Sequence, residues 1–431
     1  MPKLDPITEG RHSQNSQSDF PKSPSKSTRR GVLIPLAVIC IVFLGVCVLH
    51  TSLCLTLLVK DCYKSLFPAQ QPEFVWHPFL TSKHASNAYL RRIGYGGNPR
   101  TVFEWRTNSQ GCRDSVEYQA QKPVDVIRWI CLGGSATVWA SSNQYTIPAQ
   151  IQTKLNEVLS AKNTTAGKRV EVYNFGRVSW DSTQELFLLA TELQQYSPDF
   201  LLIYDGRNDA MWGVMPEYRP FWNMWSYEID RNLNDQSAFK RLFYPFWRLF
   251  ETFRRFKDPE MYARQKAQFL FGDRKNAEWN FYKPHKEIGR IYLQNLQTMI
   301  SVAERMGCKG VCLILQPQLN WCEKPLSQEE KDFTSNLQPS WETAMQTLYP
   351  IMREAHSTAA LSSRIPVVTA NLNSIIKNHA EWLFLEDCHF TDYGNRLAAE
   401  EIVPFMLQLM QDESSNKSKN DGKIRSSHVK L

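Results

Sequence analysis

Two short stretches of this 431-residue sequence hold side chains that could carry out nucleophilic catalysis. Ser135 follows two glycines directly after an apolar run, and such a turn can expose a serine hydroxyl. Near the C-terminus, Glu386 precedes His389 by three residues, so its carboxylate could orient the imidazole. Asp387 is also close enough to His389 to be that acid. A serine, a histidine and an acid form the side-chain set of enzymes that pass an acyl group through a covalent intermediate.

Two further turns hold groups that could assist a reaction of this kind. Gly176 follows a second apolar run, and a glycine there lets a backbone N–H approach a ligand closely. Asn208 follows a third run, and its side-chain amide could donate a hydrogen bond to an anion. Asp209 could hold that loop by accepting from local N–H groups. Each of these turns is common in proteins when taken alone. The interpretation as a catalytic site therefore depends on the order in which they occur along the chain.

The elements expected to position these residues alternate between strands and helices. Five short apolar runs, rich in β-branched and aromatic residues, are Val126–Leu132, Val170–Tyr173, Phe200–Tyr204, Val311–Leu315 and Ile365–Thr369. Such runs are typical of strands buried on both faces of a parallel sheet. Helical spacing of apolar residues occurs between them, over Pro148–Ser160, Thr183–Gln195 and Glu287–Met306. The alternation predicts an α/β fold, a three-layer sandwich around a central parallel five-stranded sheet. Its catalytic residues would then follow the carboxyl ends of the strands.

The order Ser, Gly, Asn, acid-x-x-His resembles that of the SGNH (GDSL-like) hydrolase superfamily. The third block of that superfamily, Gly-x-Asn-Asp, matches Gly206-Arg207-Asn208-Asp209. Its first block is normally Gly-Asp-Ser and reads Gly133-Gly134-Ser135 here, and its last block, normally Asp-x-x-His, begins with Glu386. The resemblance covers about residues 100–411 without 211–282. It includes Arg106–Arg113, which looks like the segment before the nucleophile strand in a membrane-anchored or secreted branch.

The resemblance implies a flavodoxin-like fold and a serine hydrolase that acts on ester bonds. Ser135 would be the nucleophile and His389 the general base, oriented by Glu386, with Asp387 as the alternative acid. The N–H groups of Ser135 and Gly176, with the Asn208 side chain, would form the oxyanion hole. This chemistry requires neither a metal nor an organic cofactor.

The same resemblance leaves several functions open. A carboxylic esterase acting on O-acyl glycans or on lysolipid-type esters is the expected function. The alternatives are a glycan O-acyltransferase, which would pass the acyl group to a sugar hydroxyl, and a non-catalytic cell-surface binding module on the same fold. The partner would accordingly be an acylated small molecule, glycan or lipid.

A long uncharged segment near the N-terminus predicts a membrane anchor. Residues 31–59 contain no Asp, Glu, Lys or Arg, and about 20 residues suffice to cross a bilayer as a helix. A cleaved signal peptide is the alternative, but its apolar region would be about 7–15 residues long. The 15 residues before the segment hold four basic residues against Asp19. The positive-inside rule then places the N-terminus in the cytoplasm and the catalytic domain outside.

Composition sets the remaining boundaries. Polar residues dominate 1–30 and 412–431, which predicts disordered tails, and 60–99 is expected to be a linker. Residues 211–282 hold five of the 13 Trp and predict a helical insertion, which could be a lid over the active site or a surface resting on the membrane. The net charge of +7 lies largely in the tails, so we expect no nucleic-acid partner. No Cys/His spacing typical of a zinc site occurs.

The expected topology can be tested with a reporter protein that is active only in the cytoplasm. Fused after Leu431, it should give no signal, because the basic flank of the predicted span keeps the N-terminus inside. The same reporter fused before Met1 is the positive control. A signal from the C-terminal fusion would contradict the predicted orientation.

Overall fold

The computed structural model describes residues 38–52, 74–77, 79–93, 102–162, 167–215, 218, 220–223, 283–335, 337 and 339–427. The chain divides into two compact units, residues 1–67 with 242–253 and residues 68–241 with 254–431. Of the first unit, the structure describes one helix over residues 38–52. The sheet and all the residues discussed below belong to the second unit.

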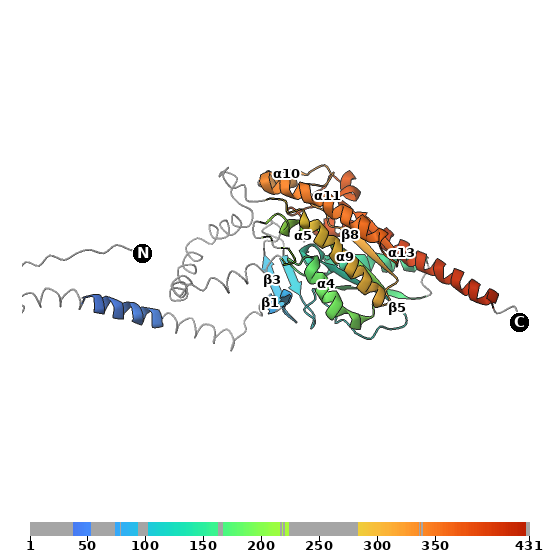
Figure 1. The fold of residues 1–431 in the computed structure, drawn as a ribbon, viewed down its shortest axis with the longest axis horizontal. Helices are drawn as coiled ribbons and strands as arrows, with labels where there is room; N and C mark the ends of the chain where they lie inside the picture. Colours follow the sequence, from blue (N-terminus) through green and yellow to red (C-terminus); the bar gives the residue numbers. More distant parts are fainter. Residues whose placement is uncertain are drawn as a thin grey trace, which may run out of the picture. The chain divides into compact units, whose positions relative to one another are not determined.

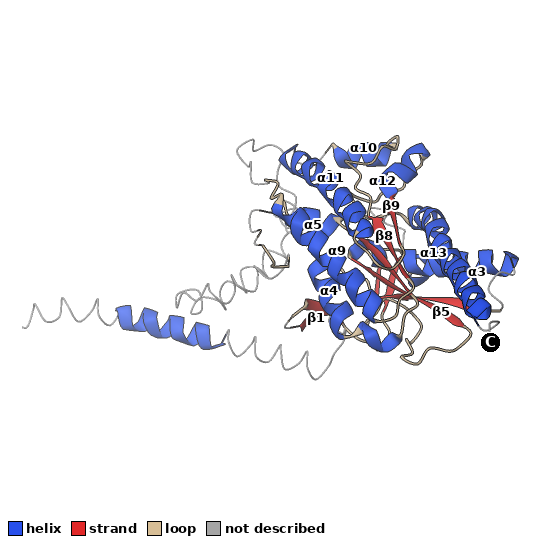
Figure 2. Cartoon of the chain, turned by 45° about the vertical axis from the view of Figure 1, so that its right-hand side comes forward, coloured by secondary structure: helices blue, strands red, loops and turns tan. Residues whose placement is uncertain are grey.

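A parallel sheet of five strands forms the centre of the second unit (Figure 2). In spatial order its strands are β6 (Arg169–Asn174), β5 (Val126–Gly133), β7 (Phe200–Asp205), β8 (Gly310–Leu315) and β9 (Val367–Asn371). All four neighbouring pairs are parallel, which confirms the sheet predicted from the apolar runs. Counted along the chain, the strand order is 2-1-3-4-5, as in flavodoxin-like folds. The strand order reverses between β5 and β7, and ligands of such sheets bind beside that point.

Helices cover both faces of the sheet, as the predicted three-layer sandwich requires (Figure 2). One face carries α4 (Ser182–Thr191), α9 (Glu287–Arg305) and α11 (Pro339–Leu361). The other carries α3 (Ile147–Lys162) and α13 (Asp392–Ser427). Successive side chains of a strand point to opposite faces, so a strand between two helical layers must be apolar throughout. In β7, Leu201 and Ile203 pack in the first core while Leu202 and Tyr204 pack in the second.

The two charged residues of the predicted strands form a pair across neighbouring strands. Arg128 of β5 is fully buried, and its Nη2 lies 3.1 Å from Oε2 of Glu171 in β6. Its Nη1 donates to the carbonyl of Tyr196 at 2.7 Å. A buried guanidinium is tolerated only when it is paired and hydrogen-bonded, and both conditions hold here.

The segment expected to be a linker contains strands instead. β1 (Phe74–His77) pairs with β2 (Thr81–His84), and β3 (Tyr89–Ile93) pairs with β4 (Val102–Arg106), both antiparallel. Each of these strands has only four or five residues, too few for a periodic pattern to show. Contacts with the sandwich hold them: the Trp180 indole donates to the carbonyl of Ser82 at 3.0 Å, and the Gln184 amide to that of Leu80 at 2.6 Å.

Several predicted segments fall partly or wholly outside the described residues. These are the tail 1–30, the ends of the expected span 31–59, and the insertion 211–282 except for 211–215, 218 and 220–223. Within the described part, none of the helices combines the length and the apolarity that crossing a bilayer needs.

The last helix is longer than the sequence indicated. α13 runs to Ser427, into the segment 412–431 expected to be a disordered tail (Figure 1). Composition of the segment taken alone does not predict this helix. Once the packed first half of α13 has formed, each further residue adds one hydrogen bond without a new nucleation step, which is why the helix can continue.

Candidate active site

The turn that follows β5 carries the predicted nucleophile. Ser135 is the first residue of the short helix α2 (Ser135–Val138), so its N–H has no partner within that helix. A Cβ atom on Gly134 would lie 2.3 Å from Nδ2 of Asn208 and 3.1 Å from the carbonyl oxygen of Trp180. Glycine at this position lets the Asn208 amide approach the turn closely.

The structure brings Ser135 and His389 together although 254 residues separate them. Oγ of Ser135 lies 2.7 Å from Nε2 of His389, and Nδ1 of the same ring is hydrogen-bonded to Oε1 of Glu386. A carboxylate can only accept, so this bond places the imidazole proton on Nδ1. Nε2 is then free to accept the proton of the serine hydroxyl. This is the arrangement a general base needs before an attack by serine.

A tight loop holds the acid and the base in place. The N–H of Leu385 donates to the carbonyl of His389 at 2.8 Å, and Phe384 pairs with Phe390 as an antiparallel bridge. The hairpin thus closes around Glu386, and the His389 side chain is only 12% exposed. The Phe384 and Phe390 rings pack at 4.6 Å between centroids, in the core beneath the loop.

Asp387, the alternative acid, does not contact His389. Its Oδ2 lies 2.6 Å from Nη2 of Arg207 and 3.4 Å from Nε2 of Gln318, and its side chain is buried. Burial by itself would raise the pKa of Asp387, but the Arg207 guanidinium, with smaller contributions from the His389 charge and the Gln318 hydrogen bond, lowers that pKa overall. The geometry therefore gives the orienting contact to Glu386 and makes Asp387 the ion-pair partner of Arg207.

The predicted oxyanion donors lie around the nucleophile turn. The Asn208 amide donates to the carbonyl of Trp180 at 2.6 Å, which leaves the second N–H of that amide for a ligand. The N–H of Gly176 donates to Oδ1 of Asn174 at 3.1 Å. A Cβ on Gly176 would lie 1.7 Å from Oγ1 of Thr137 in α2. Glycine is thus required here for contact with the nucleophile helix, whereas the sequence suggested approach to a ligand.

Asp209 does fix the Asn208 loop, but it does so through another helix. Its carboxylate accepts from the N–H of Ser182 at 3.1 Å and from the Ser182 hydroxyl at 2.5 Å, at the start of α4. Burial, followed by the charges of Asp181 and Asp205, raises the pKa of Asp209. The sequence indicated the role of this side chain but not its partner.

Two residues of the site were not identified from the sequence. Arg207 follows Gly206 at the start of α5 (Arg207–Trp212); its Nη1 lies 3.3 Å from Oδ1 of Asn208, and its Nη2 bonds to Asp387. It therefore ties the oxyanion loop to the acid–base loop. The indole of Trp139 lies on the His389 imidazole. No spacing in the sequence reveals either contact, because each depends on the folding of distant segments.

One group of side chains in the described part of the chain could in principle hold a metal ion. The ligand atoms of Glu386, Cys388 and His389 all lie within 4.8 Å of one another. Burial raises the pKa of Cys388 well above its usual value, so its sulfur stays a thiol. A protonated thiol is a poor ligand, and the Glu386 carboxylate is already bonded to Nδ1 of His389. The donor set fits the acid–base pair better than a metal.

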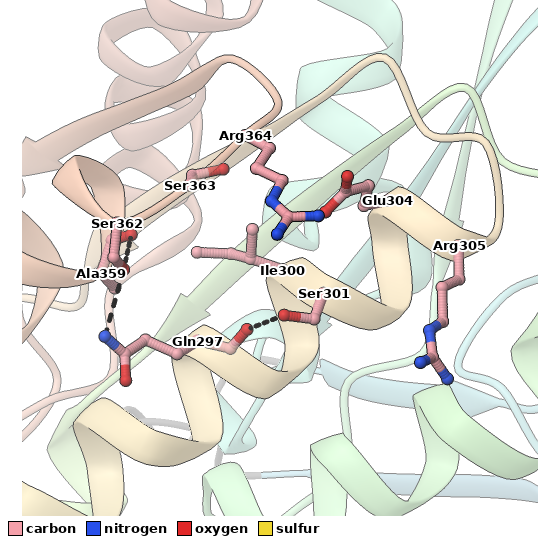
Figure 3. Close-up of a pocket in the computed structure, with 9 residues that line it drawn as sticks. All are labelled: Gln297, Ile300, Ser301, Glu304, Arg305, Ala359, Ser362, Ser363 and Arg364. Carbon is pink, nitrogen blue, oxygen red and sulfur yellow. Dashed lines mark hydrogen bonds between the residues drawn. The ribbon is translucent and has the colours of Figure 1, made fainter.

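A surface hollow of about 670 Å³ lies elsewhere, between the second half of α9 and the chain at and just after the end of α11 (Figure 3). Its polar lining includes Ser301, Arg305, Ser362 and Arg364. These residues precede β8 and β9, so the hollow lies toward the amino ends of the strands. It contains none of the predicted site residues, which follow the carboxyl ends.

Comparison with known proteins gives a similarity of fold. No protein-family model matches the sequence, and no curated protein is significantly similar to it. Solved structures that resemble it include a G-D-S-L family protein from Desulfitobacterium hafniense, at 13% identity and a TM-score of 0.35, over 65% of this chain and 99% of that one. A lipase/acylhydrolase from Enterococcus faecalis matches at 15% identity and a TM-score of 0.34, over 64% of this chain and 94% of that one.

An acetylxylan esterase from Geobacillus stearothermophilus is a third structure of this kind. It matches at 12% identity and a TM-score of 0.33, over 64% of this chain and 93% of its own length. At these identities and TM-scores, the similarity carries no information about the reaction. The geometry of Ser135, His389 and Glu386 is what points to a chemistry.

Substituting Glu386 should reduce turnover. Glu386→Gln removes the negative charge that stabilises the protonated imidazole, and we expect turnover to fall about tenfold to a hundredfold or more, since orienting acids matter by up to about 10⁴. The measurement is the rate of ester hydrolysis at saturating substrate. A rate near that of the unchanged chain would mean that His389 is oriented without Glu386.

Substituting Asp387 should instead reduce stability. Asp387→Asn leaves the Arg207 guanidinium buried without its counter-charge, which should lower the free energy of unfolding by about 3 kcal/mol. The pKa of Asp387 is below its ordinary value of 3.8 in the folded chain, so its contribution is present above pH 3.8 and is lost as the pH falls through the lower folded-state value. Denaturant unfolding of both chains should show their difference shrinking in that acid range. A turnover loss exceeding that of Glu386→Gln would reassign the acid to Asp387.

Proposed function

We propose that this chain is a membrane-anchored, extracytoplasmic serine acyl hydrolase of the SGNH type, a carboxylic esterase. One observation carries the proposal: Oγ of Ser135 lies 2.7 Å from Nε2 of His389, whose Nδ1 is bonded to Glu386. Ser135 follows the carboxyl end of β5, beside the point where the strand order reverses, and Glu386 and His389 lie in the segment between β9 and α13. The uncharged segment 31–59 and its basic flank support the anchor and the orientation.

The first half of the reaction forms an acyl-enzyme. Nε2 of His389 takes the proton of Ser135 as Oγ attacks the ester carbonyl carbon, and Glu386 stabilises the imidazolium that results. The N–H of Ser135 and the second N–H of the Asn208 amide donate to the oxyanion. The N–H of Gly176 becomes a third donor when it leaves Oδ1 of Asn174 and bonds to the substrate instead. Removing one such donor typically costs about 10²–10³ in turnover. The alcohol then leaves with the proton held on Nε2.

The second half returns the enzyme to its starting state. A water molecule gives a proton to Nε2 of His389 and attacks the acyl carbon, and the carboxylic acid leaves as Ser135 recovers its proton. If a sugar hydroxyl takes the place of water, the same steps transfer the acyl group to a glycan. The substrates we propose are O-acyl glycans or lysolipid-type esters, since an anchored site outside the cytoplasm would meet esters of these kinds.

Covalent labelling tests the nucleophile. An organophosphonate should label the full-length chain, and Ser135→Ala should abolish labelling with little change in the melting temperature, because a hydroxyl at a strand end contributes little packing. Ser142→Ala, a serine in the same loop but outside the site, should label like the unchanged chain. Full labelling of Ser135→Ala would remove this serine from the mechanism. A chain that binds acylated ligands but is never labelled would favour the binding module.

Product analysis then separates hydrolysis from transfer. The full-length chain is supplied with a short acyl ester, with and without a glycan acceptor, and both the free acid and the acylated glycan are measured. We expect free acid in both reactions. Formation of acylated glycan at the expense of free acid would identify an acyltransferase.

A further inference from the structure

The base of the proposed triad has a third contact besides Ser135 and Glu386. The indole of Trp139 stacks on the imidazole of His389, with 4.9 Å between ring centroids and 26° between ring planes. Trp139 is the C-cap of α2, four positions after the nucleophile. Nucleophile and stacking ring are therefore carried by the same short stretch of chain.

The backbone around Trp139 is fixed from one side by a buried arginine. Arg113 donates through Nη1 to the carbonyl of Val138 and through Nη2 to the carbonyl of Ala140, the latter at 2.9 Å. Its guanidinium lies over the Trp105 ring, 4.4 Å from the centroid, and is 1% exposed as a residue. Two carbonyls that flank Trp139 are thus held by one planar group, which restricts the direction of the indole.

The start of α13 fixes the same stretch from the other side. The Asn395 amide donates to the carbonyl of Trp139 at 2.8 Å. The Asp392 carboxylate accepts from the N–H of Ser141 at 2.8 Å and also from the Ser141 hydroxyl. Asp392 and Asn395 follow His389 by only a few residues, so these bonds join the segment that carries the base to the segment that carries the indole.

The stack restricts a motion that the two hydrogen bonds of His389 leave open. The two bonds hold the imidazole at its edge, at Nδ1 and at Nε2. The indole adds a contact on the face of the ring, which opposes rotation of the imidazole about its Cβ–Cγ bond. During the reaction the imidazole becomes a cation, and tryptophan is the side chain whose face attracts a cation most strongly. The indole therefore favours the charged ring as well as its orientation.

We infer that Trp139 is a positioning residue for the general base: it holds the His389 imidazole in the plane that joins Ser135 to Glu386. This inference rests on the proposed function and assigns Trp139 no contact with the reacting atoms. A merely structural role would change stability alone. A positioning role lowers the rate of the chemical step while substrate binding is retained.

The test compares Trp139→Leu with the conservative Trp139→Phe in the full-length chain. We expect Trp139→Leu to reduce kcat for a short acyl ester, and the rate of organophosphonate labelling, by about tenfold to a hundredfold, the size of loss that a small misplacement causes. KM should stay close to its original value. Trp139→Phe should restore most of both rates, because a phenyl ring can also stack. Unchanged rates in Trp139→Leu, or an equal loss in Trp139→Phe, would overturn the inference.

A second tryptophan in the same region provides the matched control. Trp382 precedes the hairpin of the base, is 37% exposed, and donates through its indole N–H to the carbonyl of Phe384 at 2.6 Å. Trp382→Leu should therefore disturb the loop without removing a ring from His389, and its labelling rate should stay near that of the unchanged chain. An equal loss in Trp382→Leu would mean that any disturbance of this loop slows the reaction, and would overturn a specific role for Trp139.

Nuclear magnetic resonance detects the stack independently of activity. In a chain labelled with ¹³C in its histidine rings, the imidazole C–H signals of His389 should be shifted upfield by the indole ring current, and the shift should disappear in Trp139→Leu. The signals are assigned by their loss in His389→Gln. If the His389 signals have the same chemical shifts in the unchanged chain and in Trp139→Leu, the stacking contact itself would be contradicted. If the shift is present but the unchanged chain is never labelled, the proposed function fails while the contact stands.

Discussion

The hydrogen bond between Ser135 and His389 is the interaction on which the proposed chemistry depends, and no local structure could form it. It joins turns 254 residues apart in the sequence. The parallel sheet makes it possible, because β5 places Ser135 at its carboxyl end and the last loop returns His389 to the same edge. To accept the serine proton at Nε2, the imidazole must carry its own proton on Nδ1, and there it is hydrogen-bonded to the Glu386 carboxylate.

Buried charges connect the separate turns into one site. Arg207 spans from Asn208 to Asp387, so the loop after β7 and the loop of the base cannot move independently. Arg113 does the same for the segment before the sheet and the stretch after the nucleophile. Buried charged groups are costly unless they are hydrogen-bonded, and the bonds that these two guanidinium groups donate join segments that are distant in the sequence. Such bonds would hold the oxyanion donors and the general base in place before the substrate binds, which is what catalysis by preorganised groups requires.

The sequence predicted most of the sheet because two-sided burial leaves a direct trace in it. All five apolar runs lie in the central sheet, since a strand between two helical layers has no polar face. The sequence did not decide between Glu386 and Asp387, because both residues are close enough to His389 along the chain to contact its ring. The ion pair with Arg207 distinguishes the two acids, because it engages Asp387, and Arg207 is distant from both in the sequence.

Other features were missed for the same physical reason. The Asn208 amide lies close to Gly134, and the side chains of Trp180 and Gln184 donate to the carbonyls of Ser82 and Leu80 in the β1–β2 hairpin. Neither contact leaves a periodic pattern in the sequence. Trp139 is a third example, since nothing in its neighbouring residues indicates that it lies on an imidazole.

The acyl-enzyme itself is the most direct test of the account. The full-length chain is mixed rapidly with an activated acetyl ester, alcohol release is followed from the first turnover, and the quenched protein is digested for mass spectrometry. The account predicts a burst of alcohol equal to the concentration of active sites, with one acetyl group on the peptide that contains Ser135. Release of alcohol without a burst and without an acetylated peptide, or an acetyl group on a different residue, would contradict it.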